Sequence, residues 1–169
     1  GVSASPGERI ALLGAYAEMG AGLVRGKAFN GRAGCAALLG LIDALSAAPL
    51  PYDVYFAFTA QELIGARGAR VAAHRIDPHA AFVLRGTEAN DLPRPDGDDS
   101  TAVIRLGGGP ALTINDPGFV ADRRLVAHLR SAAESGGIPH QVDARGNGST
   151  GGGLVALARA SVPVGVIGL

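Results

Sequence analysis

Hydrophobic and polar residues follow one another along this chain in patterns that predict alternating helices and strands. Apolar residues recur at helical spacing over 32–46, which predicts a helix there. The continuous apolar and aromatic run at 54–58 is typical of a strand covered on both faces. Residues 62–75 predict a second helix, because an acid stands in its first turn and arginines follow. A second buried strand is expected at 80–84.

The rest of the chain continues this alternation. The remaining expected elements are short strands with glycine turns at 8–29, strands at 103–106 and 111–114, an amphipathic helix at 120–134, a strand at 141–143, and a short helix before a final strand at 162–167. A polar loop at 88–100 and a glycine loop at 146–153 separate some of them. Alternating elements of this kind predict an α/β fold with a mainly parallel sheet sandwiched by helices. A length of 169 residues suits a single domain over residues 1–169.

The composition narrows the class of protein. With 47% hydrophobic and 18% charged residues the chain is globular, and its net charge of zero gives no footprint for nucleic acid or an anionic membrane. Cys35 is the one cysteine, which excludes an intramolecular disulfide framework and a multi-cysteine zinc site. No apolar run reaches the ~20 residues of a membrane span, and the opening GVSASPGERI lacks a signal-peptide pattern. We expect a cytoplasmic protein with no nucleic-acid or membrane partner.

Two glycine-rich stretches and the histidines are weak candidates for chemistry. Residues 21–27 (AGLVRGK) nearly fit a phosphate-binding loop, but the first glycine is missing and Ala28 replaces the Ser or Thr that would reach magnesium. Backbone N–H groups of the loop 146–153 could cradle an anion, although a plain connection into the next helix is the favoured interpretation. Solvated or structural roles are also favoured for the four histidines, which are His74, His79, His128 and His140.

Glu62 stands where the apolar run at 54–58 ends, in the stretch FTAQELIGARG. An acid at the end of a strand is a common way to place a general base or a metal ligand. The alternative is an ordinary acid in the first turn of a helix, where the helix dipole favours a negative charge. The residues alone favour the helix start.

Three separated motifs together resemble a known family. They are GKAFNGRAGCAALL at 26–39, PYDVYFAFTAQELIGARGA at 51–69, and a glycine-threonine loop followed by SVPVGVI at 161–167. In order and spacing they are similar to the tetrahedral aminopeptidases of metallopeptidase family M42, which include glutamyl aminopeptidases and proteins once labelled cellulases. The resemblance covers most of residues 5–169. It implies a zinc-aminopeptidase-like catalytic domain that lacks its N-terminal part and the family's small inserted β-domain.

The resemblance also implies a dinuclear metal site, from which this sequence departs. In the family, two zinc or cobalt ions activate a water that attacks the N-terminal peptide bond. Acidic residues follow the lysine-alanine-aromatic step in the family, where this chain has Asn30 and Gly31. The family's pair of glutamates is a general base followed by a metal ligand; here the pair reads Glu62 and Leu63.

Two further ligand positions differ as well. The family ends the next strand on a metal-binding aspartate, whereas this chain has Arg85, and an aspartate normally follows the threonine at the position of Thr150. Arginine brings a permanent positive charge to a place where divalent cations need negative ligands. The resemblance therefore assigns Glu62 as a vestigial general base and Arg85, Asn30 and Thr150 to the old metal pocket. No metal ligand and no cofactor are expected.

These departures indicate a degenerate homologue of the dinuclear aminopeptidases that is non-catalytic and has a scaffold, assembly or binding role. The alternative is a metal-dependent aminopeptidase that is active only with ligands supplied by another chain. Enzymatic activity is left undecided by the sequence. A homo-oligomer or a complementary subunit is expected, because a shortened sheet would expose an edge and an apolar face. A peptide is a further candidate partner.

Glu62 and Arg85 are predicted to pair. The resembling enzymes place both positions at the metal site, so the two side chains are expected to lie close together. A buried carboxylate without its cations is costly, and a guanidinium could compensate it in bidentate geometry. We therefore predict an Arg85–Glu62 ion pair, shared with Asn30, in the old metal pocket.

Overall fold

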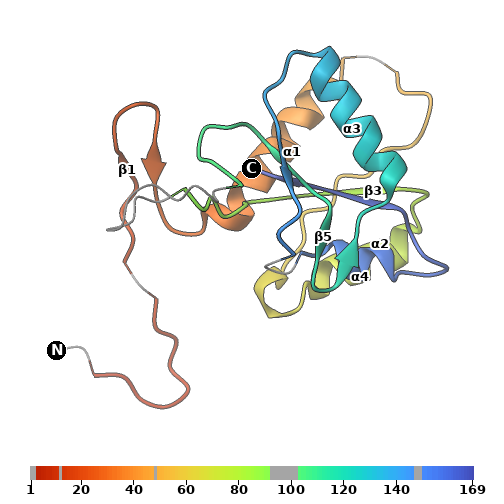
Figure 1. Ribbon diagram of the computed structural model, residues 1–169. Coiled ribbons are helices and arrows are strands. Elements are labelled where there is room, and N and C mark those ends of the chain that lie inside the picture. Colours follow the sequence, from red (N-terminus) through yellow and green to blue (C-terminus); the bar gives the residue numbers. More distant parts are fainter. Residues whose placement is uncertain (1–2, 12, 48, 92–102, 147–149) are drawn as a thin grey trace.

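A four-stranded sheet forms the centre of the molecule (Figure 1). The computed structural model describes residues 3–11, 13–47, 49–91, 103–146 and 150–169. The strands of this sheet are, in spatial order, β3 (Ala81–Arg85), β8 (Val164–Gly168), β4 (Ala111–Thr113) and β7 (Gln141–Asp143). The β3–β8 and β4–β7 pairs are parallel and the β4–β8 pair is antiparallel. The expected α/β fold with a mainly parallel sheet is confirmed.

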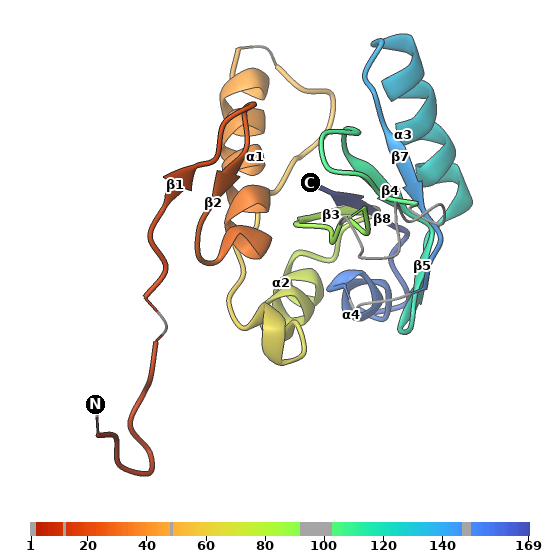
Figure 2. The same cartoon turned by 60° about the vertical axis from the view of Figure 1, so that its left-hand side comes forward.

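Helices cover both faces of the sheet. They are α2 (Arg67–Ile76), α3 (Arg123–Ser135) and α4 (Gly152–Ala156). Successive residues of a strand point to opposite faces, and in β8 a Cβ added to Gly165 would lie 3.3 Å from Leu129 of α3. The next residue, Val166, instead lies against Gly152 of α4. Hence α3 and α4 pack on opposite faces, as Figure 2 shows, and α2 packs against α4.

The main hydrophobic core lies on the face covered by α2 and α4. Its buried members are Ala73, Phe119, Ala121, Val155, Ala158, Val162, Val164 and Val166. The two valines of β8 are each 1% exposed, the lowest values in this cluster. Phe119 comes from a short hairpin of β5 (Asn115–Asp116) and β6 (Phe119–Val120), an element that the sequence pattern did not predict. This hairpin closes the core beside α4.

Helix α1 (Phe29–Leu45) packs beside β3 through two glycines. Gly34 is buried, and a Cβ at this position would meet the backbone carbonyl of Leu84. Likewise, a Cβ at Gly86 would lie 2.8 Å from the Cα of Asn30. The N–H of Gly86 donates to the carbonyl oxygen of Asn30 at 2.7 Å. The first turn of α1 is therefore fixed against the end of β3.

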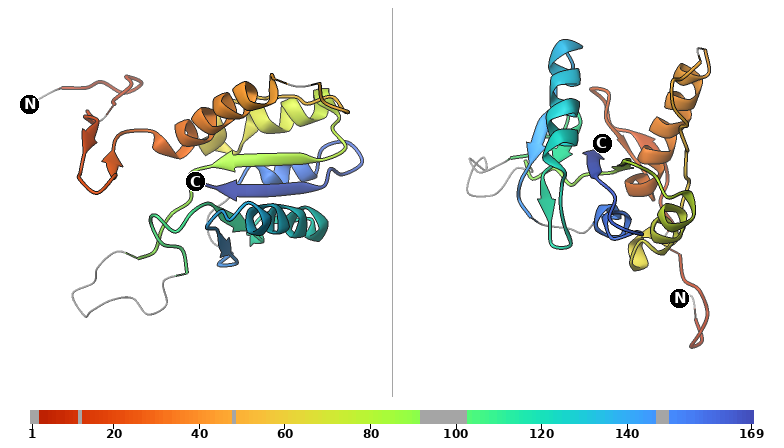
Figure 3. Two further views of the ribbon diagram at one scale, coloured as in Figure 1. Left: turned by 90° about the horizontal axis from the view of Figure 1, so that it is seen from above. Right: turned by 90° about the vertical axis from the view of Figure 1, so that its right-hand side faces the viewer.

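A small hairpin of β1 (Ala17–Glu18) and β2 (Val24–Arg25) precedes α1. It matches part of the expected short strands at 8–29. Together with the described residues 3–11 and 13–16, this hairpin extends away from the sheet (Figure 3). Within the described ranges, no helix has the length and apolar character that a membrane crossing requires.

Around Glu62, the structure differs from the prediction in two elements. The run at 54–58 forms no strand, because no described segment pairs with its backbone and a strand needs a neighbour for its hydrogen bonds. The predicted helix at 62–75 is divided into a short 3₁₀ turn, η1 (Glu62–Ile64), and α2. Between them Gly65 and Ala66 adopt left-handed conformations, with φ of 96° and 43°. Such a conformation interrupts a right-handed helix.

The expected strand at 103–106 is not formed either. Side chains instead satisfy its backbone: Asn90 Oδ1 accepts from the N–H groups of Val103 and Ile104, and Gln141 Oε1 accepts from that of Arg105. Most of the polar loop expected at 88–100 lies outside the described residues. The strands predicted at 80–84, 111–114, 141–143 and 162–167 correspond to β3, β4, β7 and β8, and the helices predicted at 32–46 and 120–134 correspond to α1 and α3.

Candidate functional site

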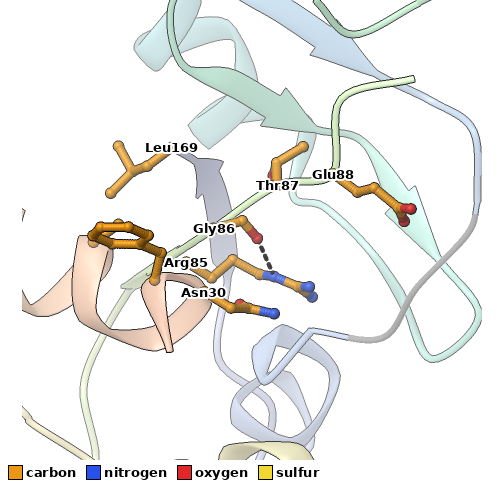
Figure 4. A pocket seen from close by; sticks show the side chains of 8 residues that line it. Asn30, Arg85, Gly86, Thr87, Glu88 and Leu169 are labelled. Carbon is orange, nitrogen blue, oxygen red and sulfur yellow. Dashed lines mark hydrogen bonds between the residues drawn. The ribbon is translucent and has the colours of Figure 1, made fainter. Parts of the chain in front are cut away.

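A pocket of about 440 Å³ opens where β3 ends beside the first turn of α1 (Figure 4). Its walls comprise an apolar set, Phe29, Ala33 and Leu169, and a polar set, Asn30, Arg85, Thr87 and Glu88, with Gly86 between them. The pocket lies at the carboxyl ends of the parallel strands β3 and β8, the edge at which open α/β sheets usually bind ligands. This makes it the candidate functional site.

Arg85 is held in the pocket by its own strand end. Its Nε–H donates to the carbonyl oxygen of Gly86 at 3.0 Å, and its carbonyl oxygen accepts from the N–H of Leu169 at 2.8 Å. In Figure 4 the guanidinium lies next to the carboxamide of Asn30, whereas the carboxylate of Glu88 points away from both. The structure thus brings together Arg85 and Asn30, two of the predicted binding residues.

Glu62 lies elsewhere. Its carboxylate faces the start of α4, since a Cβ added to Gly151 would be 3.1 and 3.3 Å from its two oxygens. The predicted ion pair between Glu62 and Arg85 is not formed: no ion pair joins these two described side chains. The left-handed turn after Glu62 places this carboxylate against α4, and the guanidinium turns back to Gly86. The role of Glu62 as a vestigial base stays a prediction.

Thr150 is buried and does not line the pocket. Its N–H donates to Asp116 Oδ2 at 2.9 Å, and its hydroxyl oxygen accepts from the N–H of Gly152 at 3.1 Å. Asp116 also accepts from the N–H of Gly118 at 2.7 Å. These bonds join the β5–β6 hairpin to the start of α4. They are a structural arrangement that sequence reasoning missed, because Asp116 and Thr150 are 34 positions apart.

A partly buried ion pair lies close to the pocket, and the sequence analysis did not predict it. Asp143 and Arg145 form two side-chain bonds of 2.8 Å each, and Arg145 donates to the carbonyl oxygen of Glu88 at 2.8 Å. The Arg145 guanidinium holds the pKa of the Asp143 carboxyl below its usual value, and the charge of Arg85 adds to this effect. Asp143 also raises the pKa of Arg145. In the stretch DAR at the end of β7, an aspartate and an arginine stand two positions apart, and this short spacing was a sequence signal for the ion pair.

The polar groups of the pocket do not fit a pair of divalent cations. Asn30 is neutral, Arg85 is a permanent cation with no lone pair to offer, and Glu88 is an exposed carboxylate that points outward. Within the part of the chain that the structure describes, no group of three or more His, Cys, Asp or Glu side chains could hold a metal ion. The described residues therefore do not form the carboxylate and histidine ligand set that such ions need.

Two solved structures show that the fold is that of an aminopeptidase-type α/β domain. The aminopeptidase APDkam598 from the archaeon Desulfurococcus kamchatkensis superposes with a TM-score of 0.81 at 32% identity, covering 91% of this chain and 43% of that one. A TET aminopeptidase from a marine sediment thaumarchaeon gives a TM-score of 0.82 at 30% identity, covering 92% and 44%. The glutamyl aminopeptidase of Lactococcus lactis is 32% identical over 143 residues, 85% of this chain and 38% of its own length.

The particular family follows from a match to its model. The model of the M42 glutamyl aminopeptidases matches residues 1–169, and the chain belongs to this family. The resemblance seen in the sequence is thus confirmed. In each of these three comparisons the chain spans less than half the length of the relative, between 38% and 44%.

Family membership corrects one expectation. We expected no cofactor, and this is wrong for a member of family M42, whose aminopeptidases use divalent metal ions. The expectation failed because it was drawn only from the substituted positions of this chain. The relatives compared here are more than twice as long as this chain.

Proposed function

We propose that this chain is a degenerate M42 homologue that provides the aminopeptidase scaffold for assembly or binding and does not itself hydrolyse peptides. The observation that carries the proposal is Arg85 at the end of β3, beside Asn30 and inside the strand-end pocket. The resemblance places a metal ligand of the family at this position. A fixed positive charge there would repel the divalent cations that activate the attacking water. Glu62 lies against α4 and is not among the pocket's lining residues.

A rough magnitude supports this proposal. Two unit charges about 4 Å apart interact with about 4 kcal/mol at an effective dielectric constant of about 20. A divalent cation at the same distance from a guanidinium would experience about twice that repulsion. Glu88 is exposed and its carboxylate points away from Arg85.

A second candidate function is metal-dependent hydrolysis of peptide N-termini, with ligands supplied by another chain. The observation in its favour is that the chain spans less than half the length of its aminopeptidase relatives. It would require at least one partner group to enter the pocket beside Arg85. The first proposal is preferred because such a group would still meet the guanidinium.

Metal analysis combined with a peptidase assay tests the proposal. The purified protein is incubated with zinc or cobalt, freed of excess metal, and assayed for metal content and for release of N-terminal residues from short peptides. We expect no chelator-sensitive hydrolysis of these peptides. Two bound metals together with hydrolysis that a chelator abolishes, and that Glu62→Gln removes, would overturn the proposal. The variant Arg70→Gln serves as a control, because Arg70 is an exposed residue of α2.

Assembly is the second part of the proposal. Among the described residues before Ala66, no hydrophobic side chain is buried. Large apolar side chains between 50% and 85% exposed gather in 52–64, namely Tyr52, Tyr55, Phe58, Leu63 and Ile64. A single domain over 1–169 with so much apolar surface is expected to associate with a second copy or with a complementary subunit. Light scattering that gives a monomer stable to dilution would contradict this. A cytoplasmic location stays a prediction from the sequence.

A further inference from the structure

The apolar run at 54–58 has no backbone partner among the described residues. No hydrogen bond joins its N–H and C=O groups to another described segment, and it crosses from α1 toward α2 as plain coil (Figure 2). Its side chains are also uncovered, since Val54, Tyr55 and Phe58 are 38%, 63% and 50% exposed. A row of backbone groups without an internal partner is a template for pairing with a further strand.

Helix α1 already occupies the edge of β3 that would otherwise be open to this run. The N–H of Ala81 donates to the carbonyl oxygen of Pro163, so alternate residues of β3, counted from Ala81, direct their backbone groups toward β8. The residues between them face the opposite edge. There the N–H of Gly86, just after β3, donates to the carbonyl oxygen of Asn30 in α1. The run is therefore left without a described strand of its own chain to pair with.

Contacts just beyond the run hold its end in place. The carbonyl oxygen of Ala60 accepts from the N–H of Gly68 at 3.1 Å, and that of Gln61 accepts from the N–H of Arg67 at 3.4 Å. A Cβ at Gly68 would lie 2.8 Å from the nitrogen of Ala60, so glycine allows α2 to approach this closely. Because the chain is anchored here, less conformational freedom is lost when a second strand binds.

The charge pattern of the run matches a second copy of the same run. Asp53 is the one charged residue over 51–60. In an antiparallel pair with its two-fold axis at Phe56, Asp53 lies opposite the second copy's Thr59. A parallel pair in register would instead place the two Asp53 carboxylates opposite each other, which is destabilising. The antiparallel arrangement is also the one that a two-fold axis generates.

The side chains match in this register as well. Alternate residues of a strand lie on the same face. One face of the two-stranded ribbon carries Val54 opposite the second copy's Phe58, and Phe56 opposite itself. Aromatic–aromatic and aromatic–β-branched pairs of this kind favour pairing. On the other face Tyr55 lies opposite the second copy's Ala57, so neither face places a charge between the two copies.

Neighbouring side chains supply the apolar area that such a pair needs, because a two-stranded ribbon alone is marginally stable in water. Tyr52, Tyr55 and Phe58 are each at least half exposed. With about 150–250 Å² for a whole aromatic side chain, they offer roughly 350 Å² per copy, nearly half of the about 800 Å² that a standard interface buries on each partner. Leu63 and Ile64 of η1, 85% and 57% exposed, add to this area.

We propose that residues 54–58 pair with the same residues of a second copy, as an antiparallel ribbon about a two-fold axis at Phe56. The second copy satisfies the backbone groups of the run and covers its exposed aromatic side chains. This inference rests on the assembly part of the proposed function, and it names the surface through which two copies associate.

Charge complementation tests the register. One variant carries Tyr55→Lys and Ala57→Lys, and the other carries Tyr55→Glu and Ala57→Glu. Positions 55 and 57 oppose each other across the axis, so each variant alone places like charges opposite each other twice. Each should raise the dimer dissociation constant at least about ten-fold in sedimentation and light scattering. An equal mixture of the two should form a mixed dimer at least about ten-fold tighter than either variant alone, detected by native mass spectrometry.

A matched control and cross-linking locate the contact. Val71→Lys combined with Val120→Lys changes two exposed valines outside the run and should leave the dissociation constant within about two-fold. In a Cys35→Ser background, Phe56→Cys should give a disulfide-linked dimer with oxidised glutathione. Tyr55→Cys in that background should not, because its counterpart is position 57 and two residues at 55 are too far apart to bridge. Circular dichroism establishes that each variant is folded.

The outcomes separate this inference from the proposed function. A dimer that the like-charged variants leave unchanged, or a mixture that stays monomeric, would overturn the inference and leave assembly through another surface intact. A wild-type chain that stays monomeric, as expected if the run pairs with a different polypeptide, would overturn both the inference and the self-association. Chelator-sensitive hydrolysis would overturn the non-catalytic function without affecting the pairing test.

Discussion

Substituting Gly34 by alanine tests how α1 is held against the sheet. Alanine is the best helix former and is favoured over glycine by about 1 kcal/mol in a helix interior. At position 34, however, the added methyl would meet the backbone carbonyl of Leu84, with the carbonyl carbon at 2.9 Å. Neither backbone can move without separating α1 from β3. We therefore expect Gly34→Ala to destabilise the protein despite the gain in helix propensity.

Gly40 provides the matched control in the same helix. A Cβ at Gly40 would meet nothing within 4 Å, so Gly40→Ala should stabilise by about 1 kcal/mol through propensity alone. Overpacking a tight contact typically costs about 1–3 kcal/mol. Because the propensity gain is common to both variants, the difference in their free energies of unfolding measures the clash, and we expect about 1–3 kcal/mol. Each kcal/mol corresponds to about 2–4 °C in Tm for a domain of this size.

The assay is thermal and urea unfolding of wild type and both variants, followed by circular dichroism. The N–H of Gly86, which donates to the carbonyl oxygen of Asn30, reports on the same contact and should exchange faster in Gly34→Ala. Gly31→Ala is a second control, since it too would meet nothing within 4 Å. Equal stabilisation by the substitutions at 34 and 40 would refute the close approach of α1 to β3.

Two further predictions concern carboxylates with lowered pKa values. Asp143→Asn should destabilise by about 1.5–3 kcal/mol, the range for a hydrogen bond to a charged group, because the ion pair with Arg145 is partly buried. Because Arg145 lowers the pKa of Asp143 in the folded state, the pair stabilises above the unfolded carboxyl pKa of about 3.9, and this contribution disappears as the pH falls through the folded value. Urea unfolding at pH 7 and pH 3 should show a smaller loss in the variant; an unchanged loss would contradict the assignment. Asp122→Ala should lower the Tm, since Asp122 caps α3 by accepting from the N–H of Arg124 at 2.8 Å, and Asp122→Ser should retain most of the cap. The bond from the Arg124 side chain lowers the pKa of Asp122 to about 2, so the cap should persist at pH 3.

Local patterns predicted the elements whose stability is local. The helices expected at 32–46 and 120–134 formed because their apolar residues recur every three or four positions, which the helix itself places on one face. Apolar runs at 80–84 and 162–167 became β3 and β8, which pair with each other. The run at 54–58 has the same character but formed no strand, because pairing depends on a neighbour that the pattern does not reveal.

The candidate site was predicted only in part, because local motifs name its residues but do not show which distant segments come into contact. The motifs identified the family, and the match to its model confirms it. Arg85 and Asn30 both line the strand-end pocket, and their assignment to the family's metal pocket stays a prediction. The motifs could not show that Glu62 turns toward Gly151, because that orientation depends on left-handed residues after it. The contact between Asp116 and Thr150 was equally hidden, since a hydrogen bond between distant segments leaves no periodic signal.

By itself, the sequence determined that a guanidinium, Arg85, and an amide, Asn30, stand where the resemblance to the family leads us to expect carboxylates. The charge of a side chain is a property of the residue and needs no fold. Only the tertiary structure decided which of these groups meet. Arg85 and Asn30 converge because glycines at 34 and 86 let α1 approach β3 closely, while Glu62 is directed to α4. Contacts of this kind depend on packing between segments that are far apart in the chain, and the pattern of residues along the sequence does not reveal that packing.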